Sequence, residues 1–237
     1  MTDRYSIRAY WGSRKEGMDV CADRLLDFFL KMESQVGIGC SWYQKGKSFR
    51  QALKLGVNVL ERETLMKLLN SGVNRKDFSK EVIVDLGFHV ALWNGKKEKE
   101  VASLSINCGS YCQTPGIGGN RVLFDLPEDL GSLSKSEQML KLFTLILDVW
   151  EPERACVCSD DAAEDRNFNA KRPFVDWIVF VPGAFLEAKN FPQAFRVLPA
   201  HSGTIIVVEP EAPNSSSTAH QQKVREIEHR LNRVLKT

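Results

Sequence analysis

The chain has 237 residues, and its 43% hydrophobic, 26% charged and 9% aromatic content is that of an ordinary globular protein, which excludes collagen-like, disordered and disulfide-scaffold chains. The 32 Lys and Arg residues nearly balance the 30 Asp and Glu residues, so the formal net charge of +2 gives no overall attraction to nucleic acid or to an anionic membrane. A partner must therefore be recognised through a local patch of the surface.

The first segment of the chain predicts a strand followed by a helix. Residues 4–11 form a β-rich run that a glycine closes. Ser13 and Glu16 then have the spacing of a capping box, in which each side chain satisfies the backbone N–H of the other residue. Gly37 and Gly39 end the predicted helix. Two shorter helices are expected at 48–55 and 61–70.

A β-hairpin is predicted near the middle of the chain. Residues 86–93 and 101–108 have the pattern of strands, and Asn94-Gly95 between them is a strong turn signal. A glycine-rich loop then leads to a third predicted strand at 121–126. These segments favour antiparallel pairing of neighbouring strands.

The second half of the chain continues this mixture. Ser134 and Glu137 repeat the capping-box spacing before an apolar, periodic helix. Three β-rich runs and a last amphipathic helix follow, at 154–158, 174–181, 204–208 and around 224–234. Strands and helices thus mix without strict alternation, which predicts an α+β fold with a largely antiparallel sheet flanked by amphipathic helices. No linker is long enough to separate two cores, so we expect residues 1–237 to form a single domain.

The chain carries the features of a cytoplasmic protein. Its first residues are polar and lack the apolar core of a secretory signal. No run approaches the roughly 18 apolar residues of a membrane helix, so no membrane partner is expected. The six cysteines are dispersed, and most lie in apolar runs, as is typical of reduced and buried thiols.

Three residues invite comparison with metal-dependent nucleases. Asp176, Glu187 and Lys189 match in order an Asp followed by Glu-x-Lys. That chemistry uses two carboxylates to hold a divalent cation and a lysine near the attacking water. The segment around Glu187 lacks strand alternation, and surface charges are the alternative interpretation.

The cysteines and histidines give weaker signals for chemistry. Cys108-x3-Cys112 and Cys156-x-Cys158 differ from the Cys-x2-Cys spacing of zinc sites. Pairing of the predicted hairpin strands could bring His89 to Cys108 as a base to a nucleophile, but a core thiol beside a core histidine is favoured. We therefore expect no catalytic residues, no metal site and no cofactor.

Charge is uneven along the chain although it is balanced overall. Seven acids between residues 148 and 165 are opposed within that segment only by Arg154. Residues 160–165 are expected to form an exposed loop between two β-rich runs. Two interpretations are open: a solvated loop that aids solubility, or an acidic surface that is complementary to a basic partner.

Several short patterns, taken together, resemble one protein family over nearly the whole chain. Among them are Tyr10-Trp11-Gly12, Trp42-Tyr43, Leu92-Trp93-Asn94-Gly95, Trp150-Glu151-Pro152 and Gly203-Thr204. In order and spacing they resemble the Immunity protein 52 domain family of bacterial polymorphic toxin systems. The resemblance rests on their combination.

That resemblance implies a non-catalytic cytoplasmic antidote with an α+β fold. Such proteins are encoded beside a secreted toxin, including toxins of type VI secretion, and the toxin is commonly a nuclease with a restriction-endonuclease-like fold. The family supplies no catalytic or binding residues that can be transferred position by position.

We therefore expect an immunity protein that binds a cognate nuclease toxin, with no direct contact to nucleic acid. The residues expected to contact the toxin are four acids, Asp160, Asp161, Glu164 and Asp165. Glu151 and Glu153 are expected to lie behind them. The alternatives are a metal-dependent nuclease that uses Asp176, Glu187 and Lys189, and an interaction adaptor unrelated to toxins.

Overall fold

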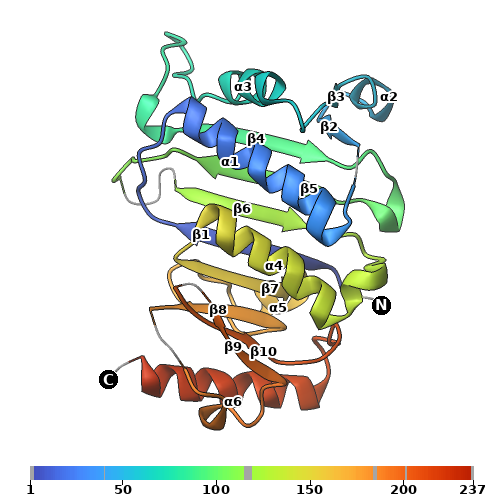
Figure 1. The fold of residues 1–237 in the computed structure, drawn as a ribbon, viewed down its shortest axis with the longest axis vertical. Coiled ribbons are helices and arrows are strands. Elements are labelled where there is room, and N and C mark those ends of the chain that lie inside the picture. The colour runs from blue at the N-terminus through green and yellow to red at the C-terminus, as the bar shows by residue number, and fades with distance from the viewer. Residues whose placement is uncertain (1–2, 40, 115–118, 184–185, 201, 236–237) are drawn as a thin grey trace.

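The computed structural model describes residues 3–39, 41–114, 119–183, 186–200 and 202–235. Its centre is one ten-stranded sheet in which neighbouring strands run antiparallel, in the order β3-β2-β4-β5-β6-β1-β7-β8-β10-β9 (Figure 1). Helices pack against this sheet, so the predicted α+β class with an antiparallel sheet is confirmed.

The strands are β1 (Tyr5–Trp11), β2 (Trp42–Gln44), β3 (Gly56–Val57), β4 (Phe88–Trp93), β5 (Ser103–Cys108), β6 (Asn120–Asp125), β7 (Arg154–Ser159), β8 (Ile178–Pro182), β9 (Arg196–Ala200) and β10 (Gly203–Val207). The α-helices are α1 (Met18–Lys31), α2 (Phe49–Ala52), α3 (Arg62–Ser71), α4 (Ser136–Trp150), α5 (Asp160–Asp165) and α6 (Thr218–Val234). Shorter helical turns are η1 (Met32–Val36), η2 (Val84–Leu86), η3 (Glu98–Glu100), η4 (Gly131–Ser134) and η5 (Ala188–Asn190).

The front face of the sheet carries α1 and α4, which cross its central strands (Figure 1). Side chains alternate along β1, so Ile7, Ala9 and Trp11 point into this layer and are buried. The indole of Trp11 stacks on that of Trp150 from α4, with ring centroids 5.7 Å apart. Phe28 from α1 meets Trp150 edge-on at 6.3 Å, and these rings join both helices to the sheet.

The back face is covered at one end by α5 and α6. Val179 on β8 and Ile206 on β10 form a separate apolar cluster with the buried stripe of α6, which includes Val224, Ile227 and Leu231. The back of β7 packs against α5 through a smaller cluster of cysteines, alanine and phenylalanine. The apolar spacing predicted for the last helix thus marks its buried side, although Val234 at its end is exposed.

The rest of the back face stays open to solvent. On β4, β5 and β6 the residues that point to the front are buried, except the partly buried Phe88, whereas the alternate residues are partly or fully exposed. His89, Asn107, Arg121 and Tyr10 are lateral neighbours across four strands and point to this side. We call this half-exposed back surface of β4, β5, β6 and β1 the open face.

Two predicted helix starts differ from the structure. Helix α1 begins after Gly17 and has no side-chain cap, so the Ser13 and Glu16 capping box is wrong. Glu16 instead lies 3.0 Å from the guanidinium of Arg24, and this ion pair takes the carboxylate that the box would need. Helix α4 also has no side-chain cap, because the Ser134 hydroxyl donates to the carbonyl of Gly131.

Candidate partner-binding surfaces

The six acidic candidates fall into two groups at opposite ends of β7. Glu151 and Glu153 precede the strand, and Asp160 to Asp165 follow it. A strand rises by about 3.3 Å per residue, so the six residues of β7 place the groups about 20 Å apart. The acids that are close in sequence therefore do not form one continuous patch.

The second group lies on a helix, so the prediction of an exposed loop at 160–165 is wrong. The hydroxyl of Ser159 accepts the backbone N–H of Ala162 at 3.1 Å and caps α5. Two buried alanines of α5 face the sheet, which leaves its acids toward solvent. The helix has only six residues, so its amphipathic spacing could not be recognised from the pattern of charges alone.

The acids of α5 differ in how much of their charge is available. Asp160 lies 3.0 Å from the guanidinium of Arg8 and accepts a hydrogen bond from the Ser6 hydroxyl. Asp161, Glu164 and Asp165 are exposed, and within the described parts of the chain they form no ion pair. Three carboxylates of α5 are thus free to face a partner.

The first acidic group borders a hollow on the front side. Glu151 lies between Arg14 and Arg24, at 3.5 and 3.3 Å. Glu153 accepts the backbone N–H of Gly12 at 3.1 Å. Together with Asp148 these carboxylates line a groove of about 840 Å³ between α4 and the end of the sheet, whose apolar walls include Leu140, Leu147, Phe180, Leu198 and Ile205.

The structure does not bring the three nuclease candidates together. Asp176 is only 1% exposed, and its carboxylate accepts the backbone N–H of Ser159 at 2.8 Å. Glu187 and Lys189 are exposed at η5, where they pair with each other. Among the described residues, no group of three His, Cys, Asp or Glu side chains could hold a metal ion. The contacts therefore give Asp176 a structural role.

Sequence reasoning missed the buried network around Asp176. His220 of α6 places Nε2 3.0 Å from the Asp176 carboxylate and Nδ1 3.6 Å from that of Glu209. The guanidinium of Arg166 lies 3.7 Å from the Asp176 carboxylate and 3.1 Å from that of Glu228 on α6. Burial raises the pKa of Glu228. The available signal was the position of His220, four residues before Val224 on the buried stripe of α6.

The hairpin register separates the Cys108 thiol from His89. Phe88 is opposite Cys108, and His89 is opposite Asn107, so the histidine and the thiol point to opposite faces. A hydrogen bond with Cys21 and burial raise the pKa of Cys108. A hydrogen bond with Cys158, at 3.9 Å between the sulfur atoms, and burial do the same for Cys156. His89 is partly exposed on the open face, so the prediction of a core histidine is wrong, whereas Cys108 and Cys156 match their interpretation as buried core thiols.

Thiol alkylation checks this interpretation. We expect iodoacetamide at neutral pH to modify the partly exposed Cys112 of the native protein at least about 10-fold faster than Cys108 or Cys156, because the thiolate is the reactive form. Peptide mass spectrometry after timed quenching measures the three rates. In denaturant the rates should converge, and equal rates in the native protein would contradict the buried, high-pKa assignment.

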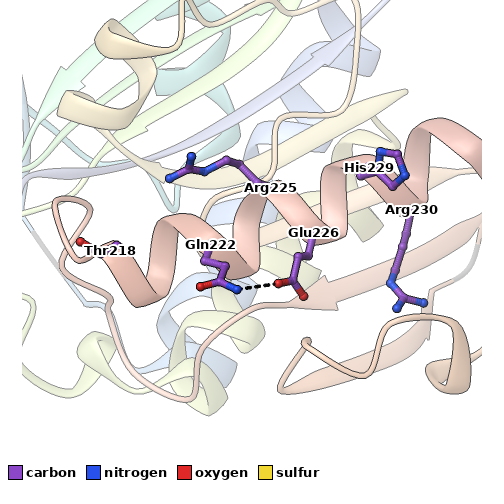
Figure 2. Close-up of a pocket in the computed structure, with 6 residues that line it drawn as sticks. All are labelled: Thr218, Gln222, Arg225, Glu226, His229 and Arg230. Atoms are coloured by element: carbon purple, nitrogen blue, oxygen red, sulfur yellow. Dashed lines mark hydrogen bonds between the residues drawn. The ribbon is translucent and has the colours of Figure 1, made fainter.

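A shallow hollow of about 520 Å³ lies along the outer side of α6 (Figure 2). All six lining residues in the figure come from this one helix, and Gln222 donates a hydrogen bond to Glu226 at 3.0 Å. Arg230 points away from Arg225 and donates to the carbonyl of Asn190 at 3.1 Å. This is the solvated polar side of an amphipathic helix, opposite its buried stripe.

Comparison with known proteins identifies a matching family and a solved structure of similar fold. The model of a family described as Immunity protein 52 matches residues 3–235. A solved structure, "Pseudomonas aeruginosa T6SS protein PA0821", is similar with a TM-score of 0.59 and 14% identity, over 97% of this chain and 75% of that one. No curated protein matches the chain. None of the described helices is long and apolar enough to cross a membrane.

Proposed function

The chain belongs to the Immunity protein 52 family, and from that premise we propose that it binds and neutralises a cognate secreted nuclease toxin. The match of the family over residues 3–235 is the observation that carries this proposal. The toxin would have a restriction-endonuclease-like fold, and the antidote would act in the cytoplasm of producing and sister cells. Similarity in fold to a protein titled as a T6SS protein supports delivery of the toxin by type VI secretion.

Neutralisation would occur by covering the surface with which the toxin holds nucleic acid. A nuclease must present basic groups to a polyanionic substrate. The exposed carboxylates of Asp161, Glu164 and Asp165 on α5 have the complementary charge and no internal partner among the described residues. Asp160 contributes less, because Arg8 already neutralises it.

Glu151 and Glu153 would act behind these contacts. Both carboxylates are engaged within the chain, with Arg24 at 3.3 Å and with the N–H of Gly12 at 3.1 Å. They border the apolar groove beside α4, which could receive a non-polar side chain of the same toxin. A toxin that reached both acidic groups would have to span the length of β7.

Co-expression with the product of the adjacent gene tests the function. If that product is the toxin, it should arrest growth when expressed alone, and this protein should rescue growth and co-purify with it. Rescue without co-purification would contradict neutralisation by direct binding. Absence of both would contradict the immunity function and favour the adaptor alternative.

Reversing the three free charges of α5 tests the acidic contact. We expect Asp161→Lys, Glu164→Lys and Asp165→Lys together to weaken toxin binding by at least about 10-fold at low salt, and to make the affinity less sensitive to salt. Calorimetric titration at several salt concentrations measures both effects.

A second triple variant is the matched control, because it changes the net charge by the same amount as the α5 variant. Glu33→Lys, Glu63→Lys and Asp77→Lys replace three exposed acids that lie outside α5, on η1, on α3 and after α3. This triple variant should retain the affinity and the salt dependence of the natural protein. Equal weakening by both triple variants would show a general charge effect and contradict a contact at α5.

A further inference from the structure

Arg121 lies on the open face in a position that leaves its guanidinium incompletely satisfied. It sits on β6 between Asn107 on β5 and Tyr10 on β1. Its Nε is removed from solvent and, within the described residues, has no hydrogen-bond partner. An unsatisfied buried donor is unfavourable for the fold, and more so when it is charged, so Arg121 contributes little to the stability of the free chain.

Several other partly buried arginines of the protein are paired with a carboxylate. Arg8 pairs with Asp160 at 3.0 Å, Arg24 with Glu16 at 3.0 Å and Arg166 with Glu228 at 3.1 Å. Arg121 has no such pair in the part of the chain that the structure describes. Its charge is therefore available to a group from outside the chain.

Arg121 borders a hollow of about 640 Å³, which we call the arginine hollow, and cations predominate among the charged side chains of its mixed polar and apolar lining. Arg154 and Lys171 bring two further cations, while Glu153 lies 3.6 Å from Arg154 and offsets part of its charge. Tyr10 and Asn107 add groups that can donate hydrogen bonds. Burial raises the pKa of Tyr10 to about 12, so its phenol keeps its proton at neutral pH.

We propose that the arginine hollow receives a carboxylate side chain of the toxin, with Arg121 as the cation that binds it. This inference rests on the proposed function. A guanidinium binds a carboxylate through two parallel hydrogen bonds, and Arg121 lines the hollow with no carboxylate of its own among the described residues. A metal-dependent nuclease carries such carboxylates to hold its divalent cation.

The composition of the surroundings favours a carboxylate on a protein over a free phosphate. Glu153 in the wall of the hollow would repel a dianion more strongly than a single carboxylate. The open face beside the hollow carries partly exposed Leu123 and Trp93, which suit contact with another protein surface. The protein would therefore offer the toxin a cationic pocket in addition to the acids of α5.

The test measures binding to the purified product of the adjacent gene and the stability of the free protein. We expect Arg121→Met to weaken binding by about 30-fold or more, and Arg121→Lys to weaken it less, because lysine keeps the charge but lacks the fork. Arg172→Met, which removes an exposed arginine outside the hollow, is the control and should bind like the natural protein.

Thermal unfolding separates binding from a structural role. Because Arg121 has no carboxylate partner among the described residues of the free chain, Arg121→Met should leave the Tm unchanged or raise it. A lowered Tm with unchanged affinity would show that Arg121 only supports the fold and would overturn the inference. Unchanged affinity and unchanged Tm would also overturn it.

Two further outcomes distinguish the sources of failure. If the natural protein does not bind the product of the adjacent gene, the proposed function fails, and the inference fails with it. Inorganic phosphate and acetate are compared as ligands through the Tm. If phosphate raises the Tm of the natural protein but not that of Arg121→Met, and acetate raises the Tm of neither protein, the hollow binds phosphate and the carboxylate assignment is overturned. Binding that is weakened in the Arg121 variants but not in Arg172→Met supports the inference.

Discussion

Replacement of Asp176 with alanine is expected to lower the free energy of unfolding by about 3–5 kcal/mol, because it removes one member of a buried charged network. The carboxylate is 1% exposed and is held by the N–H of Ser159, by His220 and by Arg166. Its loss would leave these three groups without their acceptor between β7 and α6. Urea denaturation followed by circular dichroism measures the change.

The matched control for this change is Glu187→Ala. Glu187 is exposed and pairs only with Lys189 among the described residues, so its removal should alter stability by less than about 0.5 kcal/mol. The two variants also separate the structural role from the nuclease alternative. If both retained full stability while a Mg²⁺- or Mn²⁺-dependent nuclease activity of the natural protein disappeared, Asp176 would be a catalytic residue instead.

Replacement of Gly87 with alanine is expected to cost about 3–5 kcal/mol, through backbone strain and overpacking together. Gly87 has φ +64° and ψ −142°, a region that is essentially restricted to glycine. A Cβ at this position would collide with the carbonyl oxygen of Cys108 and with the backbone N–H of Ser110. Because these atoms belong to backbone, the strand pair β4–β5 would have to shift.

Gly17→Ala is the control for the Gly87 variant. Gly17 precedes α1 with φ −73°, and a Cβ there would meet no described atom within 4 Å. Its unfolding free energy should therefore stay within about 1 kcal/mol of that of the natural protein. A Gly87→Ala protein as stable as the Gly17→Ala protein would contradict the backbone conformation assigned to Gly87.

The parts of the fold that local sequence determines could be predicted. The hairpin of β4 and β5 was predicted because both strands alternate and Asn94-Gly95 lies between them. Strand β9 was not predicted, since Pro199 interrupts its pattern and the strand exists by pairing with β10 at the edge of the sheet. Both capping boxes failed because other contacts engage the side chains: Glu16 pairs with Arg24, and the Ser134 hydroxyl donates to the nearby carbonyl of Gly131.

The candidate surfaces were harder to predict than the fold class. The acids were identified correctly as a charged segment, but β7 separates them, and only the structure shows that Arg8 neutralises Asp160. The arginine hollow was missed entirely. Arg121, Tyr10 and Arg154 are distant in sequence, and the register of β6, β1 and β7 is what aligns them. Their assignment as binding residues remains a prediction, as does the single domain.

The place of β1 in the sheet has a consequence for how the protein is made. β1 precedes every other strand in the chain, yet it pairs on one side with β6 and on the other with β7. A ribosome must therefore pass Ser159 before both neighbours of β1 exist. Pairing over such sequence separations is slow, because the loops must close before contacts form. The emerging chain would have to keep β1 incompletely paired, and the proposed neutralisation of a toxin would have to wait until the centre of the sheet had closed.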